Sequence, residues 1–125
     1  MSIIYFGTTS KARKIGETTQ RLYKRVSRIR ETEKDFKILG YVEYNGDKVT
    51  NLLIESILRY ELVKLGYEHF GNDHFKKSKK TYKQFSKDCL NIITTTLNNY
   101  DITEYKVKAW KKAFTTKKKR GNNNE

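Results

Sequence analysis

The sequence predicts an α+β fold: a small three-stranded antiparallel sheet flanked by helices, followed by a basic helical extension. Short apolar strand-like segments alternate with longer helix-like segments in the N-terminal part of the chain. The segment over residues 48–66 is apolar nearly throughout, and lysine becomes dominant after residue 75. A chain of 125 residues suits one compact domain. We therefore expect a core over residues 1–75 and a basic extension with a disordered tail over residues 76–125.

Two strands are expected at the N-terminus. Residues 2–6 are apolar and read as a buried strand, and residues 7–10 have the composition of a turn. Residues 11–16 would then return as an antiparallel strand that ends at Gly16. These features predict a β-hairpin at the start of the chain.

A basic helix is expected over residues 19–31, with Thr18 or Thr19 as its N-cap. Its apolar residues Leu22, Val26 and Ile29 are spaced by four and three, so they share one face. The other face carries arginine and lysine. We expect the apolar face to lie on the sheet and the basic face to point outward.

The middle of the chain predicts a third strand and a buried helix. Residues 36–44 alternate well enough for a strand. Residues 48–66 are apolar around most of the helix circumference, which is typical of a helix buried on all sides. Gly66 is a natural residue to end this helix.

The second half of the chain is more polar. Residues 67–75 form a predicted loop that contains both histidines, and residues 76–80 are a basic run. We expect a helix over residues 81–99 and a short final helix over residues 103–114 around Trp110. The remaining residues are expected to form a disordered basic tail.

The net charge of +13 favours a polyanionic partner, of which nucleic acid is the commonest. A basic protein that is soluble or ribosome-associated is the alternative. The single cysteine, Cys89, excludes an internal disulfide and suits a reducing, cytoplasmic compartment. With only His69 and His74 beside it, a structural zinc site is not expected. No apolar run reaches membrane-spanning length, so no membrane association is expected.

Four residues are candidates for chemistry. Glu55 lies in the apolar helix with Arg59 four residues later, so it is either a helix ion pair or a metal ligand. Arg25 lies about two turns into the basic helix, where its guanidinium can bind a phosphate or simply be solvated. By default, Tyr5 is a core aromatic residue and Lys14 a solvent-facing strand lysine.

In this order, these segments resemble the GIY-YIG nuclease superfamily over roughly residues 2–70. Residues 3–5 resemble the first signature strand, and Lys14-Ile15-Gly16 resembles the second, with lysine in place of tyrosine. The run that ends at Arg25 and the helical segment around Glu55 resemble the parts that carry the arginine and the glutamate. Asn72 is the candidate counterpart of a late asparagine.

The resemblance implies a metal-dependent endonuclease that hydrolyses DNA phosphodiester bonds, of phage or viral type. Glu55 would hold Mg²⁺ or Mn²⁺, and Tyr5 as a phenolate would be the general base. Lys14, across the hairpin, would lower the pKa of Tyr5, and Arg25 would bind the scissile phosphate. Second-rank candidates are Tyr23, Arg21 and His74.

Further basic residues are expected to contact phosphates with little sequence specificity. Residues 106–120 alone hold eight lysine and arginine residues and no acid. Trp110 would either stack on a base or anchor the final helix. The expected nucleic-acid contacts are Arg21, Lys24, Arg28, Lys76, Lys77, Lys79, Lys80, Lys111, Lys112, Lys117, Lys118, Lys119 and Arg120.

Two other function classes remain open at this stage. One is a catalytically inactive GIY-YIG-like module that binds DNA or RNA, which the lysine at position 14 slightly favours. The other is a phage factor that binds a host protein. A homodimer is one option for the oligomeric state, because a single site cuts one strand at a time.

Overall fold

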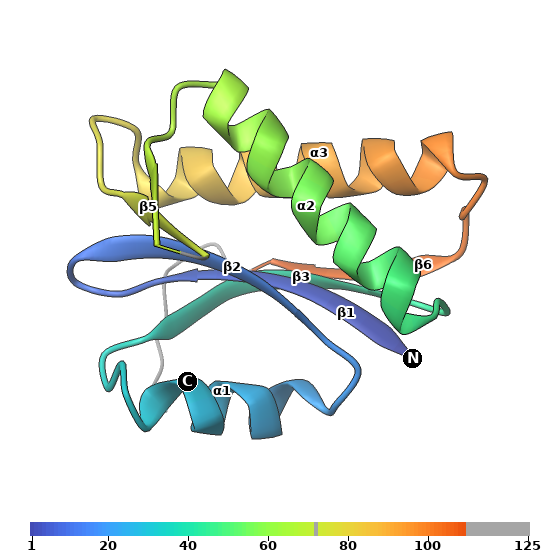
Figure 1. Cartoon of the computed structure of the whole chain (residues 1–125), viewed down its shortest axis with the longest axis horizontal. Helices are drawn as coiled ribbons and strands as arrows, with labels where there is room; N and C mark the ends of the chain where they lie inside the picture. The colour runs from blue at the N-terminus through green and yellow to red at the C-terminus, as the bar shows by residue number, and fades with distance from the viewer. Residues whose placement is uncertain (72, 110–125) are drawn as a thin grey trace, which may run out of the picture.

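The computed structural model describes residues 1–71 and 73–109 as three layers (Figure 1). A six-stranded antiparallel sheet is covered by α2 and α3 on one face and by α1 on the other (Figure 1). Along the chain the elements are β1 (Ser2–Thr8), β2 (Ala12–Thr18), α1 (Leu22–Arg30), β3 (Lys37–Tyr44), α2 (Lys48–Lys64), β4 (His69–Phe70), β5 (His74–Lys76), α3 (Tyr82–Asn99) and β6 (Tyr105–Ala109).

The α+β class is confirmed, but the prediction of a three-stranded sheet is wrong. The sheet has the strand order β4-β5-β2-β1-β3-β6, so the three predicted strands are its centre. β1 pairs with both β2 and β3, and Tyr5 lies opposite Gly16 on one side and Tyr41 on the other. Three further strands extend the sheet at its two edges.

Those edge strands replace a predicted loop and a predicted helix. The predicted loop over residues 67–75 contains β4 and part of β5, and β5 pairs with β2. The predicted final helix begins instead as β6, which pairs with β3 from Tyr44 to Gly40. Pairing with a distant strand outweighs the local helical pattern here, because strand preference depends mainly on neighbours across the sheet. The rest of the predicted helix, including Trp110, lies outside the described residues.

Two hydrophobic cores lie on the two faces of the sheet. The larger one is filled by fully buried side chains of the sheet, α2 and α3, among them Phe6, Phe75 and Phe85. The smaller one joins Tyr5 of β1 to Val26 and other apolar residues of the α1 layer. Residues on both sides of the expected boundary between 75 and 76 therefore share one core, because α3 contributes Phe85, Cys89 and Ile93 to it.

α2 is buried on one side only, which corrects the prediction of a helix buried all round. Its inner face carries Ile54, Glu55 and Leu58, whereas Val49 and Tyr60 on its outer face are 76% and 63% exposed. The sheet covers only one face of a helix, so the outer apolar residues remain exposed. Asp47 caps the start of α2 by accepting a hydrogen bond from the Thr50 N–H, at 2.7 Å.

Two predicted helix ends have different outcomes. α1 begins at Leu22 after Arg21, and neither Thr18 nor Thr19 caps it, because β2 continues through Thr18. Gly66, by contrast, follows Leu65, the C-cap of α2, with a φ of 98°, the left-handed conformation typical of a helix end. Among the helices that the structure describes, none has the length and apolar character to cross a membrane.

Candidate active site

Gly16 opens a path for the Tyr5 side chain across β2. A methyl group added at Gly16 would lie 2.2 Å from the Tyr5 hydroxyl oxygen, so the phenol occupies the space of the missing side chain. β5 pairs with β2 only from Ala12 to Lys14, and Gly16 lies beyond that pairing. The Tyr5 hydroxyl therefore sits beside the part of β2 that β5 does not cover.

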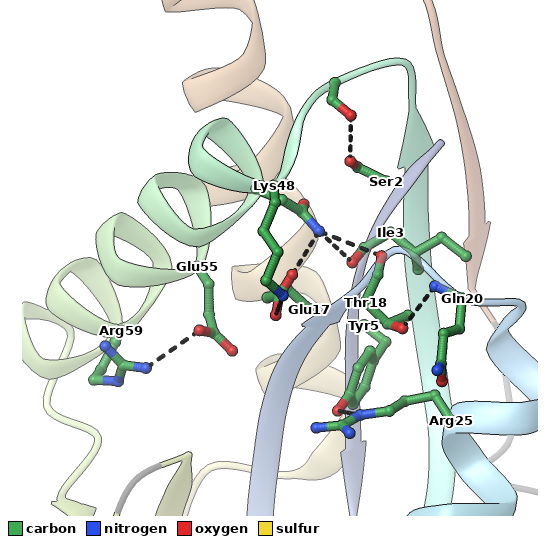
Figure 2. Close-up of polar contacts among 12 residues, drawn as sticks. Ser2, Ile3, Tyr5, Glu17, Thr18, Gln20, Arg25, Lys48, Glu55 and Arg59 are labelled. Carbon is green, nitrogen blue, oxygen red and sulfur yellow. Dashed lines mark hydrogen bonds and ion pairs between the residues drawn. The ribbon is translucent and has the colours of Figure 1, made fainter.

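Arg25 reaches the same position from α1. Its Nε donates a hydrogen bond of 3.1 Å to the Tyr5 hydroxyl (Figure 2). Burial raises the pKa of Tyr5 above its usual value of 10.0, and Arg25 only partly opposes this effect. The phenol therefore holds its proton at neutral pH, and its hydrogen bond in turn raises the pKa of Arg25.

Glu55 approaches from α2, on the other side of β2. Its residue surface is only 8% exposed, and its carboxylate points from α2 toward the strand that carries Glu17 (Figure 2). Burial raises the pKa of Glu55 to about 7, Asp73 adds to the increase, and Arg59 opposes it. Glu55 also raises the pKa of Tyr5, and Arg25 lowers the pKa of Glu55. Tyr5, Arg25 and Glu55 thus lie within electrostatic reach of one another.

The ion pair between Glu55 and Arg59 is present but shared. Arg59 Nη2 lies 3.6 Å from Glu55 and 3.3 Å from Asp73, so one guanidinium faces two carboxylates. The Arg59 Nε is buried without a hydrogen-bond partner. The predicted helix ion pair is therefore present, and Glu55 shares its partner with Asp73.

Two acidic residues of this site were missed by sequence reasoning. The backbone carbonyl of Asp73 accepts a hydrogen bond of 3.0 Å from the Ile15 N–H, which places it beside β2 next to Gly16. Glu17 follows Gly16 and accepts a hydrogen bond of 3.0 Å from Asn51 of α2. Glu17 was visible in the sequence beside the signature glycine. Asp73 gave no signal, because only the pairing of β5 with β2 brings it there.

Lys14 is held by a different partner from the one expected. Its Nζ lies 3.4 Å from Glu33, whose other oxygen lies 2.7 Å from Nε2 of His74. Although burial opposes it, contacts with His74 and Lys14 lower the pKa of the Glu33 carboxyl. Lys14 lies opposite Gly7 in the sheet, and the cation hydrogen-bonded to Tyr5 is Arg25. The residue that lowers the pKa of Tyr5 is therefore Arg25, and not Lys14 as expected.

The predicted nucleic-acid contacts divide into three groups. Arg21, Lys24 and Arg28 are exposed on the outer side of the α1 layer, and Lys77 and Lys79 are exposed before α3. Lys76 forms an ion pair with Glu68, and Lys80 donates to the Leu65 carbonyl with its Nζ 4.5 Å from the Tyr67 ring centre. Asn72 and the remaining predicted contacts lie outside the described residues: Lys111, Lys112, Lys117, Lys118, Lys119 and Arg120.

Glu55 and Asp73 are the carboxylates that could hold a magnesium-type ion in this region. Mg²⁺ is usually held by one or two carboxylates, with water and substrate phosphates as its other ligands. Glu55 and Asp73 are two carboxylates drawn to one guanidinium. Within residues 1–71 and 73–109, no group of three or more His, Cys, Asp or Glu side chains is arranged to hold a metal. A site of this kind would therefore need the substrate to complete its coordination.

Comparisons with known proteins identify no relative of this chain. No protein-family model matches the chain, and no curated protein or solved structure matches it either.

Proposed function

We propose that this protein is a metal-dependent endonuclease that hydrolyses DNA phosphodiester bonds. The observation that carries the proposal is the hydrogen bond between Arg25 and the Tyr5 hydroxyl beside Gly16, with the Glu55 carboxylate within electrostatic reach of both. These three groups come from β1, α1 and α2, so the tertiary fold alone brings them together. The resemblance to GIY-YIG nucleases, which selected the same three residues from the sequence, supports the proposal.

Arg25 would act on the phosphate. Its Nε is engaged with Tyr5, which leaves the terminal nitrogens of the guanidinium to donate to a phosphate oxygen. Such donors stabilise the negative charge that grows on the phosphate in the transition state. The hydrogen bond to Tyr5 would also hold the guanidinium in a fixed orientation.

Tyr5 and Glu55 would act on the proton and the metal. Glu55, with Asp73 beside it, would hold Mg²⁺ or Mn²⁺, which would supply positive charge to the phosphate and to the leaving oxygen. Tyr5 is fully buried in the free protein, so its hydroxyl oxygen would meet the attacking water only once substrate binding exposes it. It would accept a proton from that water after releasing its own proton to solvent. Burial, Asp73 and Glu55 all oppose that loss, and Arg25 favours it. Neutralisation of the two carboxylates is therefore a condition for Tyr5 to act as a base.

The test is nicking of supercoiled plasmid with Mg²⁺ or Mn²⁺, and with EDTA as the blank. Glu55→Gln, Arg25→Ala and Tyr5→Phe should each lower the nicking rate by about 100-fold or more, as loss of one transition-state contact does elsewhere. Glu61→Gln is the matched control, because Glu61 lies on the same helix but pairs with Lys64 at the surface. A Glu55→Gln protein that nicks as fast as the wild type would refute the proposal.

A second candidate is a catalytically inactive module that binds nucleic acid. Lys14 is neutralised by Glu33, and the pKa of Tyr5 is raised, so two of the four expected catalytic groups are not activated in the free protein. The strongly basic surface would remain usable for binding. Shifted DNA in a gel, without nicking by correctly folded protein in either metal, would select this candidate.

A further inference from the structure

Arg13 of β2 is a buried cation bonded to a neutral hydroxyl. The residue is only 8% exposed, and its Nη1 donates a hydrogen bond of 2.7 Å to the Thr8 hydroxyl oxygen. In the part of the chain that the structure describes, no carboxylate forms an ion pair with Arg13. Burial of a charge without an opposite charge costs free energy, and most buried arginines are paired. Arg13 therefore lacks the negatively charged partner that a buried guanidinium usually has.

Arg13 lines a cavity of about 280 Å³ that is rich in donors. Arg13, Lys37 and Lys77 place three cations around it, against one carboxylate, Asp35. Asp35 lies at the surface and already accepts a hydrogen bond of 2.8 Å from the Ser10 N–H. The lining therefore carries a net positive charge. Its remaining residues are Thr8, Thr9, Ser10 and Tyr82.

Three distant segments form this cavity at one end of the molecule. The β1–β2 turn, the start of β3 and the segment that leads into α3 lie together at the left of the view (Figure 1). Arg13 precedes Gly16 by three residues on β2, which is about 10 Å along a strand. Since side chains alternate along a strand, Arg13 and Gly16 face opposite sides of the sheet: the Arg13 cavity lies toward α3, whereas the Tyr5–Arg25 pair lies toward α1.

We propose that the Arg13 cavity binds a phosphate group, and that in the working protein this is a backbone phosphate of the nucleic acid. The second part rests on the proposed endonuclease function. A guanidinium matches the geometry of phosphate oxygens, and lysines at the rim add charge. The cavity accepts a phosphate and its ester oxygens, whereas apolar ligands would leave the Arg13 charge unpaired.

The test is a titration of the ¹⁵N-labelled full-length chain with inorganic phosphate, followed by NMR at constant ionic strength. Binding should shift the Arg13 Nε–H signal and the amide signals of Thr9 and Ser10. Lys77→Ala should weaken phosphate binding about tenfold, since a hydrogen bond to a charged group is lost. Lys79→Ala is the matched control: it removes the same charge from an exposed lysine that does not line the cavity, and should leave the affinity unchanged. The test uses only the wild type, Lys77→Ala and Lys79→Ala. It therefore needs no substitution of the buried Arg13 and does not depend on whether such a variant folds.

A duplex oligonucleotide without terminal phosphates separates the two sources of phosphate. If it displaces inorganic phosphate from Arg13, the ligand is the nucleic-acid backbone. If inorganic phosphate binds and the duplex leaves the Arg13 signal unchanged, the backbone assignment is overturned and the site belongs to a free phosphate or phosphate monoester. Unchanged signals with phosphate, or equal effects of Lys77→Ala and Lys79→Ala, overturn the site itself. The titration does not measure nicking. A cavity that fails to bind phosphate would therefore not refute Glu55-dependent cleavage, and an absence of cleavage would not refute phosphate binding in the cavity.

Discussion

Replacement of Glu55 by glutamine should make the metal-free protein more stable above pH 7. The Glu55 carboxyl is buried beside Asp73, and together these surroundings raise its pKa to about 7. The folded state therefore favours the protonated form of Glu55, and ionisation of this group costs stability. Glutamine has nearly the same shape as the protonated carboxyl and cannot ionise, so it avoids that cost.

The size of the effect follows from the two pKa values. A carboxyl with a usual pKa of 4.5 and a folded-state value of about 7 differs by about 2.5 pH units. At about 1.36 kcal/mol per unit, the upper limit is about 3 kcal/mol. Because the folded-state pKa is raised, the stability of the wild type is fully present below pH 4.5 and falls as the pH rises through about 7. The advantage of Glu55→Gln should grow over the same range and then become constant.

Urea unfolding in EDTA at a series of pH values measures this difference directly. Glu61→Gln is the control, because an exposed ion pair with Lys64 should change stability by about 0.5 kcal/mol or less at any pH. A Glu55→Gln protein that is less stable than the wild type at pH 8, or a difference that does not depend on pH, would refute the reasoning. If Glu55 holds Mg²⁺, saturating metal should stabilise the wild type and leave Glu55→Gln unchanged.

Two further substitutions test the site and the core. Gly16→Ala would place a methyl group 2.2 Å from the Tyr5 hydroxyl oxygen, so it should cost about 1–3 kcal/mol in urea unfolding and abolish nicking; unchanged nicking would show that the Tyr5 position does not matter. Phe85→Ala should cost about 3–5 kcal/mol, since this ring is fully buried against Phe6, Tyr67 and Phe75. Calorimetry should record one transition for the wild type, whereas separate unfolding of α3 and the sheet would contradict the shared core.

Local patterns in the sequence determined the central elements of the fold. The strands over residues 2–6, 11–16 and 36–44 and the helix over residues 81–99 are predicted from composition, turn residues and local pattern, and each is present with shifted ends. When a strand or helix buries one face, its apolar residues recur along the segment with the period of that structure. The family resemblance selected Tyr5, Lys14, Arg25 and Glu55, and the fold brings three of them, Tyr5, Arg25 and Glu55, within electrostatic reach of one another.

Contacts between distant segments decided the rest. β6 is a strand because β3 offers it an edge, and Asp73 joins the site because β5 pairs with β2. Lys14 pairs with Glu33, which also contacts His74, and both residues are far from Lys14 in the chain. Sequence alone reports which residues prefer which local structure and which face they bury. The partner of an edge strand and the partner of a buried charge are determined only when the layers pack. The free energies of strand pairing and of desolvation depend on neighbours that the local sequence does not contain.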